Sequence, residues 1–235
     1  DGSLKNSEIK NLEKVIPDSK VITKKQSDHE LKFLKKEYPL CHKYRENCLW
    51  ALKLVDLLFY GGSEFLYIDS DLVFLRPFKN LLNLSNSKSG MIYMKDSMYS
   101  YRFNFLDIFK GLPKNIVWRL NAGFIYGKNL KTNLNVLEQI LQKWPQLLER
   151  GGCDQTIWSI IAAKETSFYW NPREVRMVTW KDKSFLKEGV VLHLSSPVRS
   201  KFSEAIKYSK RKIGKKTFKV NKYKSINYKN YELFF

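Results

Sequence analysis

A short apolar run that ends in two closely spaced acids constrains the fold of this chain more than any other feature of its sequence. Residues 65–68 form the run, and Asp69 and Asp71 follow it directly. A continuous run of this length is typical of a strand that is buried on both faces of a sheet. Ligands bind at the carboxyl ends of the strands in open α/β sheets, so we expect the two acids to lie at a ligand site.

The other apolar segments predict strands and helices in alternation. Strands are expected at 90–94, 120–126 and 190–194, and helices at 45–60, 133–148 and 154–163. This alternation predicts an α/β fold in which a mostly parallel central sheet is flanked by helices. With 235 residues and 43% hydrophobic side chains, the chain can bury a core without disulfide or metal crosslinks.

Cysteine content and hydropathy bear on where the protein works. The three cysteines, Cys41, Cys48 and Cys153, form no Cys-x-x-Cys pair and would leave one thiol unpaired after any bridge. This pattern favours a reducing compartment, which we take to be the cytoplasm. No apolar run approaches the roughly 20 residues that a membrane-spanning helix needs.

The net charge of +19 favours partners that carry phosphate, such as nucleic acid, an anionic membrane or a phosphorylated substrate. Residues 199–235 hold twelve Lys and Arg side chains against two acids, interleaved with aromatic residues. We therefore divide the chain into a main domain at 1–198 and a basic, aromatic C-terminal tail at 199–235. The tail is expected to be a basic helix or a poorly ordered segment that contacts an anionic membrane, or simply a solvated basic face. It contains no clear RNA-binding motif, so nucleic acid is not an expected partner.

Asp69 and Asp71 are suited to bind one divalent cation together. Alternate side chains of an extended segment point to the same side, so both carboxylates would meet the same ion. Hard oxygen ligands suit Mg²⁺ or Mn²⁺, and such an ion neutralises the charge that grows on a departing nucleoside diphosphate. Alone, an Asp-x-Asp pair is weak evidence, because a turn with two solvated acids has the same pattern.

The segment around the two acids resembles a known family. Residues 67–74 are similar to the DxD segment of GT-A fold glycosyltransferases, especially glycogenin-like and related bacterial enzymes. Three further matches follow in the family's order: Asn121-Ala122-Gly123, Asp154-Gln155 and a late histidine, His193. Ordered matches over most of residues 1–200 are far more specific than any one of them.

The resemblance implies a GT-A (Rossmann-like) domain that moves a sugar from a nucleotide sugar, with a UDP-sugar expected, to a hydroxyl group. The acceptor would be a glycan, a lipid-linked molecule or a protein. The implied metal ligands for Mn²⁺ or Mg²⁺ are Asp69, Asp71 and His193, and the implied catalytic residues beside the sugar are Asp154 and Gln155. The implied donor-binding residues are Lys53, Asp56, Asp69, Ser70, Asp71, Asn121, Ala122, Gly123 and Arg199.

Two departures from the family pattern bear on activity. Glycogenin-like enzymes have Gly and Lys near the diphosphate, three and six residues after the histidine, where this chain has Ser196 and Arg199. Arginine can still bind phosphate, whereas serine puts the close backbone approach in doubt. The sequence also begins after the strand-helix unit that binds much of the nucleoside in that family. The resemblance therefore implies an N-terminally truncated domain, or a diverged one that has lost donor binding.

Two other functions are compatible with these residues. Asp69-x-Asp71-x-Val73 after an apolar strand also matches the nucleophile motif of haloacid-dehalogenase-type phosphatases, in which the first Asp attacks phosphorus and the second protonates the leaving group. Against this, the motif does not open the chain, and no downstream acidic pair follows a strand. The second alternative is a non-catalytic module whose basic tail binds nucleic acid or an anionic membrane, with strongly salt-dependent affinity.

Overall fold

A computed structural model describes residues 4–84, 87–102, 113, 115–149, 153–182, 185–212, 217–225 and 227–229. The chain forms two compact units. The first combines residues 1–60 with 133–151, and the second combines 61–132 with 152–235. In the part of the chain that the structure describes, no helix is both long enough and apolar enough to cross a membrane.

The first unit is helical. Its helices are α1 (Asn6–Val15), α2 (Lys24–Glu30), α3 (Leu34–Glu37), α4 (Pro39–Asn47), α5 (Leu49–Tyr60), α7 (Leu134–Lys143) and α8 (Gln146–Glu149). The helix expected at 45–60 is thus divided at Cys48. The helix expected at 133–148 is divided before Pro145, which cannot continue the hydrogen-bond ladder of a helix.

A carboxylate joins α4 to α7 within this unit. The backbone amides of Leu40 and Cys41, in the first turn of α4, both donate to the Glu138 carboxylate of α7 at 2.8 Å. The first amides of a helix have no partner inside it, and a negative charge there is favourable. Glu138, a residue of α7, therefore supplies hydrogen-bond acceptors for the first backbone amides of α4.

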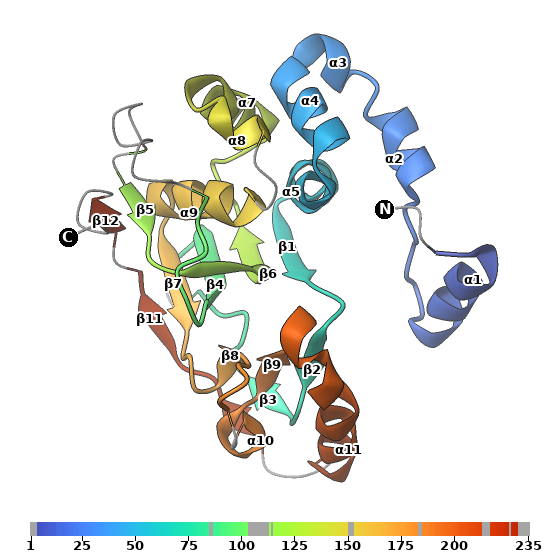
Figure 1. Ribbon diagram of the computed structural model, residues 1–235, viewed down its shortest axis with the longest axis vertical. Coiled ribbons are helices and arrows are strands. Elements are labelled where there is room, and N and C mark those ends of the chain that lie inside the picture. Colours follow the sequence, from blue (N-terminus) through green and yellow to red (C-terminus); the bar gives the residue numbers. More distant parts are fainter. Residues whose placement is uncertain are drawn as a thin grey trace. The chain divides into compact units, whose positions relative to one another are not determined.

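The second unit is built on a five-stranded sheet in the order β1-β6-β4-β7-β11 (Figure 1). The strands are β1 (Glu64–Ile68), β6 (Leu120–Lys128), β4 (Gly90–Lys95), β7 (Ser167–Trp170) and β11 (Lys222–Lys224). Helix α9 (Asp154–Lys164) packs against β6. The unit is therefore α/β, as the sequence predicts.

The expectation of a mostly parallel sheet is wrong. Within the five-stranded sheet only β4 and β7 pair in parallel, and the other three pairings are antiparallel. β6 explains the error, because all of its residues except Lys128 are buried. One face of β6 contributes Phe124 and Tyr126 to the main core cluster, and α9 packs on the strand as well. A strand covered on both faces has a continuous apolar sequence whichever direction its neighbours run.

A second, three-stranded sheet carries the late histidine. Its order is β2 (Leu72–Phe74), β9 (Val191–His193) and β8 (Val175–Met177), with β2 antiparallel and β8 parallel to β9. His193 lies between Leu72 and Met177 in this register. The short helix η1 (Ser196–Lys201) follows β9.

The segment that the sequence sets apart as a tail, 199–235, lies in the same compact unit as the residues before it. Helix α11 (Phe202–Lys212) packs on β2, and Ala205 is buried there. The strands β10 (Phe218–Lys219), β11 and β12 (Asn227–Lys229) pair with β3 (Phe78–Lys79), β7 and β5 (Asn115–Val117), respectively. The described part of this unit also contains the helix α10 (Phe185–Glu188).

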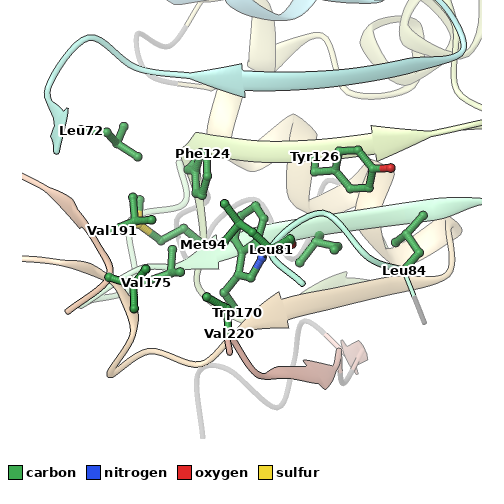
Figure 2. Close-up of a cluster of buried hydrophobic side chains, with 12 residues drawn as sticks. Leu72, Leu81, Leu84, Met94, Phe124, Tyr126, Trp170, Val175, Val191 and Val220 are labelled. Atoms are coloured by element: carbon green, nitrogen blue, oxygen red, sulfur yellow. Dashed lines mark hydrogen bonds between the residues drawn. The ribbon is translucent and has the colours of Figure 1, made fainter. Parts of the chain in front are cut away.

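One hydrophobic cluster joins the two sheets (Figure 2). The rings of Phe124 and Trp170 stack with their centroids 4.4 Å apart, and neither is exposed. The Trp170 indole N–H donates to the Leu81 carbonyl at 2.8 Å, which satisfies its polar atom. Leu72 and Val191 extend the cluster into the three-stranded sheet. The cluster therefore fixes the strand that carries His193 against the strand that carries Phe124.

We expect Trp170→Ala to lower the free energy of unfolding by about 3–5 kcal/mol, because it removes a large, fully buried ring. Trp170→Phe should cost less, since it retains an aromatic ring and loses mainly the hydrogen bond to Leu81. Urea unfolding followed by far-ultraviolet circular dichroism measures both. A loss below about 1 kcal/mol for Trp170→Ala would contradict the buried, stacked position of the ring.

Candidate functional site

The Asp-Ser-Asp segment is a turn between β1 and β2, rather than the extended segment expected from the sequence. The amide of Asp69 donates to the Gly123 carbonyl at 2.8 Å, and the amide of Leu194 donates to the Asp71 carbonyl at 2.9 Å. Ser70, between the two acids, is exposed. These backbone bonds attach the turn to β6 on one side and to the end of β9 on the other.

The turn and β9 bring together the three residues that the sequence predicts as metal ligands. One ligand atom from each of Asp69, Asp71 and His193 lies within 4.8 Å of the others. The Nε2 atom of His193 is 2.9 Å from the Asp71 carboxylate and 3.9 Å from the Asp69 carboxylate. All three side chains are at least three-quarters buried, with exposed fractions of 22% for Asp69, 15% for Asp71 and 7% for His193.

Asn121 determines which nitrogen of His193 faces the carboxylates. Its Oδ1 atom accepts a hydrogen bond from the Gly123 amide at 2.9 Å and lies 3.2 Å from Nδ1 of His193. A backbone amide can only donate, so this atom of the side chain is the oxygen, and Nδ1 must carry a hydrogen that it donates. The nitrogen that points at the acids is therefore Nε2, which offers a lone pair to a metal ion when the ring is neutral and donates to Asp71 when the ring is protonated.

This donor set fits a divalent cation. A metal-binding histidine ordinarily donates its other ring nitrogen to an oxygen of the protein, as His193 does to Asn121. Two carboxylates and one imidazole suit Mn²⁺, and also Mg²⁺. Among the described residues, this is the one group of three or more potential ligands close enough to hold an ion.

Gly123 is required by the close packing of the ligands. A Cβ atom at this position would lie 2.5 Å from Cε1 of His193 and 2.8 Å from Oδ2 of Asp69. The register between β4 and β6 also shifts beside it, between Tyr93 and Met94. The resemblance predicts that Gly123 contacts the donor, and the structure shows that it also leaves room for two ligand side chains. Its neighbour Ala122 is buried.

Asp96, directly after β4, is a site residue that the sequence motifs missed. Its Oδ2 atom accepts hydrogen bonds from Nε2 of Gln155 at 2.8 Å and from Nδ2 of Asn121 at 3.2 Å. Only 4% of Asp96 is exposed. The residues Gln155, Asp96, Asn121 and His193 therefore form one hydrogen-bonded chain. The available signal was the same as for Asp69, namely an acid directly after a buried apolar strand.

Asp154 adds negative charge to the same corner of the unit. It is the first residue of α9 and is only 4% exposed, and the N-cap position of the helix is held by Cys153. Tyr67 donates its hydroxyl to Oδ1 of Asp69 at 2.5 Å. Burial, together with the charges of Asp69, Asp154 and Asp71, raises the pKa of Tyr67. Tyr67 is therefore a permanent hydrogen-bond donor to Asp69.

Asp71 is a carboxylate at every pH near neutrality. A hydrogen bond from His193, opposed by burial and assisted by Arg199, lowers the pKa of Asp71 to about 2. The Arg199 guanidinium lies 3.3 Å from Asp71, and 66% of its side chain is exposed. Arg199 thus presents an accessible positive charge at the edge of the cluster.

Lys53 and Asp56 lie on α5 in the first unit, and their predicted contact with a donor stays a prediction. Within that unit Asp56 accepts from Nε of Arg45 at 2.7 Å and from the Ser27 hydroxyl at 2.6 Å. Arg45 also binds Asp28, and only 7% of its side chain is exposed. This network gives Asp56 a structural role: it neutralises a buried guanidinium.

Comparisons with known proteins do not identify a family for this chain. No protein-family model matches the sequence, and no curated protein matches it significantly. A solved structure, described as a glycosyltransferase involved in the glycosylation of the major capsid of PBCV-1, is similar with a TM-score of 0.42 and 14% identity. The similarity covers 73% of this chain and 78% of that chain. A similarity of this size does not identify an activity.

We expect Arg45→Met to lower the free energy of unfolding by about 2 kcal/mol, because it removes the cation that pairs with Asp56 and one of the two cations that pair with Asp28. Both acids are partly exposed, which keeps the loss below that of a fully buried pair. The matched control is Lys24→Met, which removes an exposed partner of Asp28 and should cost less than about 0.5 kcal/mol. Equal losses for the two variants in urea unfolding would contradict the central position of Arg45.

We expect Gly123→Ala to displace His193 or Asp69, because the new methyl group has no space beside either. The overpacking should lower the free energy of unfolding by about 1–3 kcal/mol. Since the chain has three histidines, the imidazole resonances of His193 can be assigned by substitution and followed by NMR. Unchanged His193 resonances in a stable Gly123→Ala protein would show that the site is looser than the structure indicates.

Proposed function

We propose that this chain is a metal-dependent glycosyltransferase of the GT-A type that moves a sugar from a nucleotide sugar, with UDP as the expected nucleotide, to a hydroxyl acceptor. The observation that carries the proposal is the convergence of Asp69, Asp71 and His193 around Gly123, with His193 oriented by Asn121. These residues belong to three separate motifs of the sequence, and no single motif requires that they contact one another.

The metal site would serve the leaving group. Mn²⁺ or Mg²⁺ held by Asp69, Asp71 and His193 would supply charge neutralisation for the departing nucleoside diphosphate. Arg199 would add to this, because its exposed guanidinium can bind phosphate oxygens in a bidentate manner. Ser70 is exposed in the turn between the two acids, and it would contact the same ligand.

The hydrogen-bonded chain that ends at Gln155 would serve the sugar. Gln155 is partly exposed while its amide nitrogen is held by Asp96, so its orientation is fixed where a sugar hydroxyl would meet it. Asp154 is buried beside it and is close enough to Tyr67 to raise the pKa of that residue. A negative charge at Asp154 would favour the positive charge that develops on a sugar ring during glycosyl transfer. We therefore assign the catalytic role to Asp154 and the positioning role to Gln155.

The pKa of Asp71 argues against the phosphatase alternative. In that mechanism the second acid of the motif must hold a proton that it gives to the leaving group. Asp71 has a pKa of about 2, because His193 and Arg199 stabilise its charged form. A permanently ionised carboxylate suits a metal ligand and does not suit a general acid.

We expect this chain to bind UDP only in the presence of Mn²⁺, and Asp71→Asn to weaken that binding at least about tenfold, through loss of a charged ligand. Isothermal titration calorimetry with and without Mn²⁺ measures both. The matched control is Glu204→Gln, which removes the same charge from an exposed position on α11 and should leave binding unchanged.

Two outcomes would go against the proposal. Absence of manganese-dependent UDP binding by the unmodified chain would contradict a working donor site. Hydrolysis of p-nitrophenyl phosphate that disappears in Asp69→Asn, without any binding of UDP, would support the phosphatase alternative instead.

A further inference from the structure

We propose that Trp180 and Met98 form a platform on which a sugar ring of the acceptor stacks. This inference rests on the proposed function and extends it, since it assigns a saccharide, rather than a lipid chain or a bare protein hydroxyl, to the acceptor side of the site. The platform is defined by these two side chains, which lie on different segments of the second unit.

Both side chains are unusually exposed for their type. Trp180 is 69% exposed and Met98 is 63% exposed, whereas Trp158 and Trp170 of the same unit are almost completely buried. An isolated exposed apolar residue needs no explanation. Here, however, two of them lie on segments that meet at one point, the side chain of Met177.

Met177 places both segments beside the proposed sugar site. Its sulfur lies 3.6 Å from Nδ2 of Asn121 and 3.7 Å from the hydroxyl of Ser97, the residue before Met98. Met177 also pairs with His193 across the three-stranded sheet. Trp180 follows Met177 by three residues, so its backbone lies within about 10 Å of it. An indole side chain can cover much of that distance.

The turn that carries Trp180 is held rigidly. Asp182 accepts from the amide of Thr179 at 2.8 Å and from its hydroxyl at 3.1 Å, and Arg176 binds the other oxygen of Asp182 at 2.5 Å. Lys201 donates to the Asp182 carbonyl at 3.1 Å. The segment with Met98 is held similarly, because the Met98 amide donates to Asp96 at 3.2 Å. Rigid presentation of an exposed indole reduces the entropy lost when a ligand stacks on it.

The chemistry of these side chains matches one face of a sugar. The C–H groups of a pyranose ring are weakly apolar and pack on the flat face of an indole, and a thioether adapts to irregular apolar surfaces. A bilayer anchor would require neither a fixed turn nor proximity to Asn121. A nucleobase would also stack on indole, and the experiment therefore measures nucleotide binding as well.

The test uses the full chain with Mn²⁺ and UDP present and a panel of soluble disaccharides: lactose, maltose, cellobiose and N-acetyllactosamine. Saturation-transfer NMR is expected to detect binding of at least one of them at millimolar concentration, with the strongest signals from ring C–H protons. Trp180→Ala should weaken this binding about tenfold, and Trp180→Phe should retain most of it. The matched control is Trp50→Ala, which removes a 50% exposed indole from α5 in the first unit and should change nothing.

The outcomes separate this inference from the proposed function. Failure of every disaccharide to bind, or equal binding by Trp180→Ala, overturns the platform while manganese-dependent UDP binding remains intact. Loss of UDP affinity in Trp180→Ala, with disaccharide binding unchanged, would place the indole against the nucleobase and also overturn it. Co-sedimentation with phosphatidylserine vesicles that depends on Trp180, without saccharide binding, would show a membrane contact instead. Absence of UDP binding by the unmodified chain, together with disaccharide binding that depends on Trp180, would contradict the proposed function and leave the platform standing.

Discussion

The amide oxygen of Asn121 is the atom on which the arrangement of the site depends. It accepts one hydrogen bond from the Gly123 amide and a second from His193, so its identity as an oxygen is fixed by the backbone. From this it follows which imidazole nitrogen faces Asp69 and Asp71. The Asn121 amide nitrogen then reaches Asp96, and Asp96 reaches Gln155. One side chain thus determines the orientation of His193, beside the two acids, and of Asp96, which holds Gln155.

The sequence predicted the ligand cluster better than it predicted the sheet. Asp69 and Asp71 were identified because they directly follow an apolar strand, and His193 was identified because it resembles the late histidine of GT-A enzymes. The direction of neighbouring strands leaves no such mark, since β6 is buried on both faces whether its neighbours are parallel or antiparallel. The break at Cys48 was not predicted, because apolar residues continue at helical spacing from α4 into α5.

Contacts between distant segments were beyond the reach of sequence patterns. Asp96 bears no motif, and its importance arises only when β4, β6 and α9 bring it beside Asn121 and Gln155. The environment of Asp56 likewise depends on Arg45 and Ser27, which the resemblance did not connect to it. The basic composition of 199–235 suggested a separate tail, yet its described strands pair with strands of the same compact unit. The charge of a segment indicates that its side chains are exposed to solvent. It does not indicate whether its backbone pairs with neighbouring strands.

The single chain of hydrogen bonds from Gln155 to His193 also limits how this protein can diverge. An acid in place of Asn121 would set a carboxylate against Asp96. A loss of Asp96 would leave the Asn121 amide nitrogen with the weak acceptor of the Met177 sulfur and would remove the carboxylate that holds the Gln155 amide nitrogen. Neither change is neutral alone, so inherited variation at these positions is expected to be concerted. Met98 and Trp180 have no such constraint, because their side chains are mostly in solvent. If these two side chains contact an acceptor sugar, as we propose, substitutions there can change acceptor preference without disturbing the hydrogen-bonded chain.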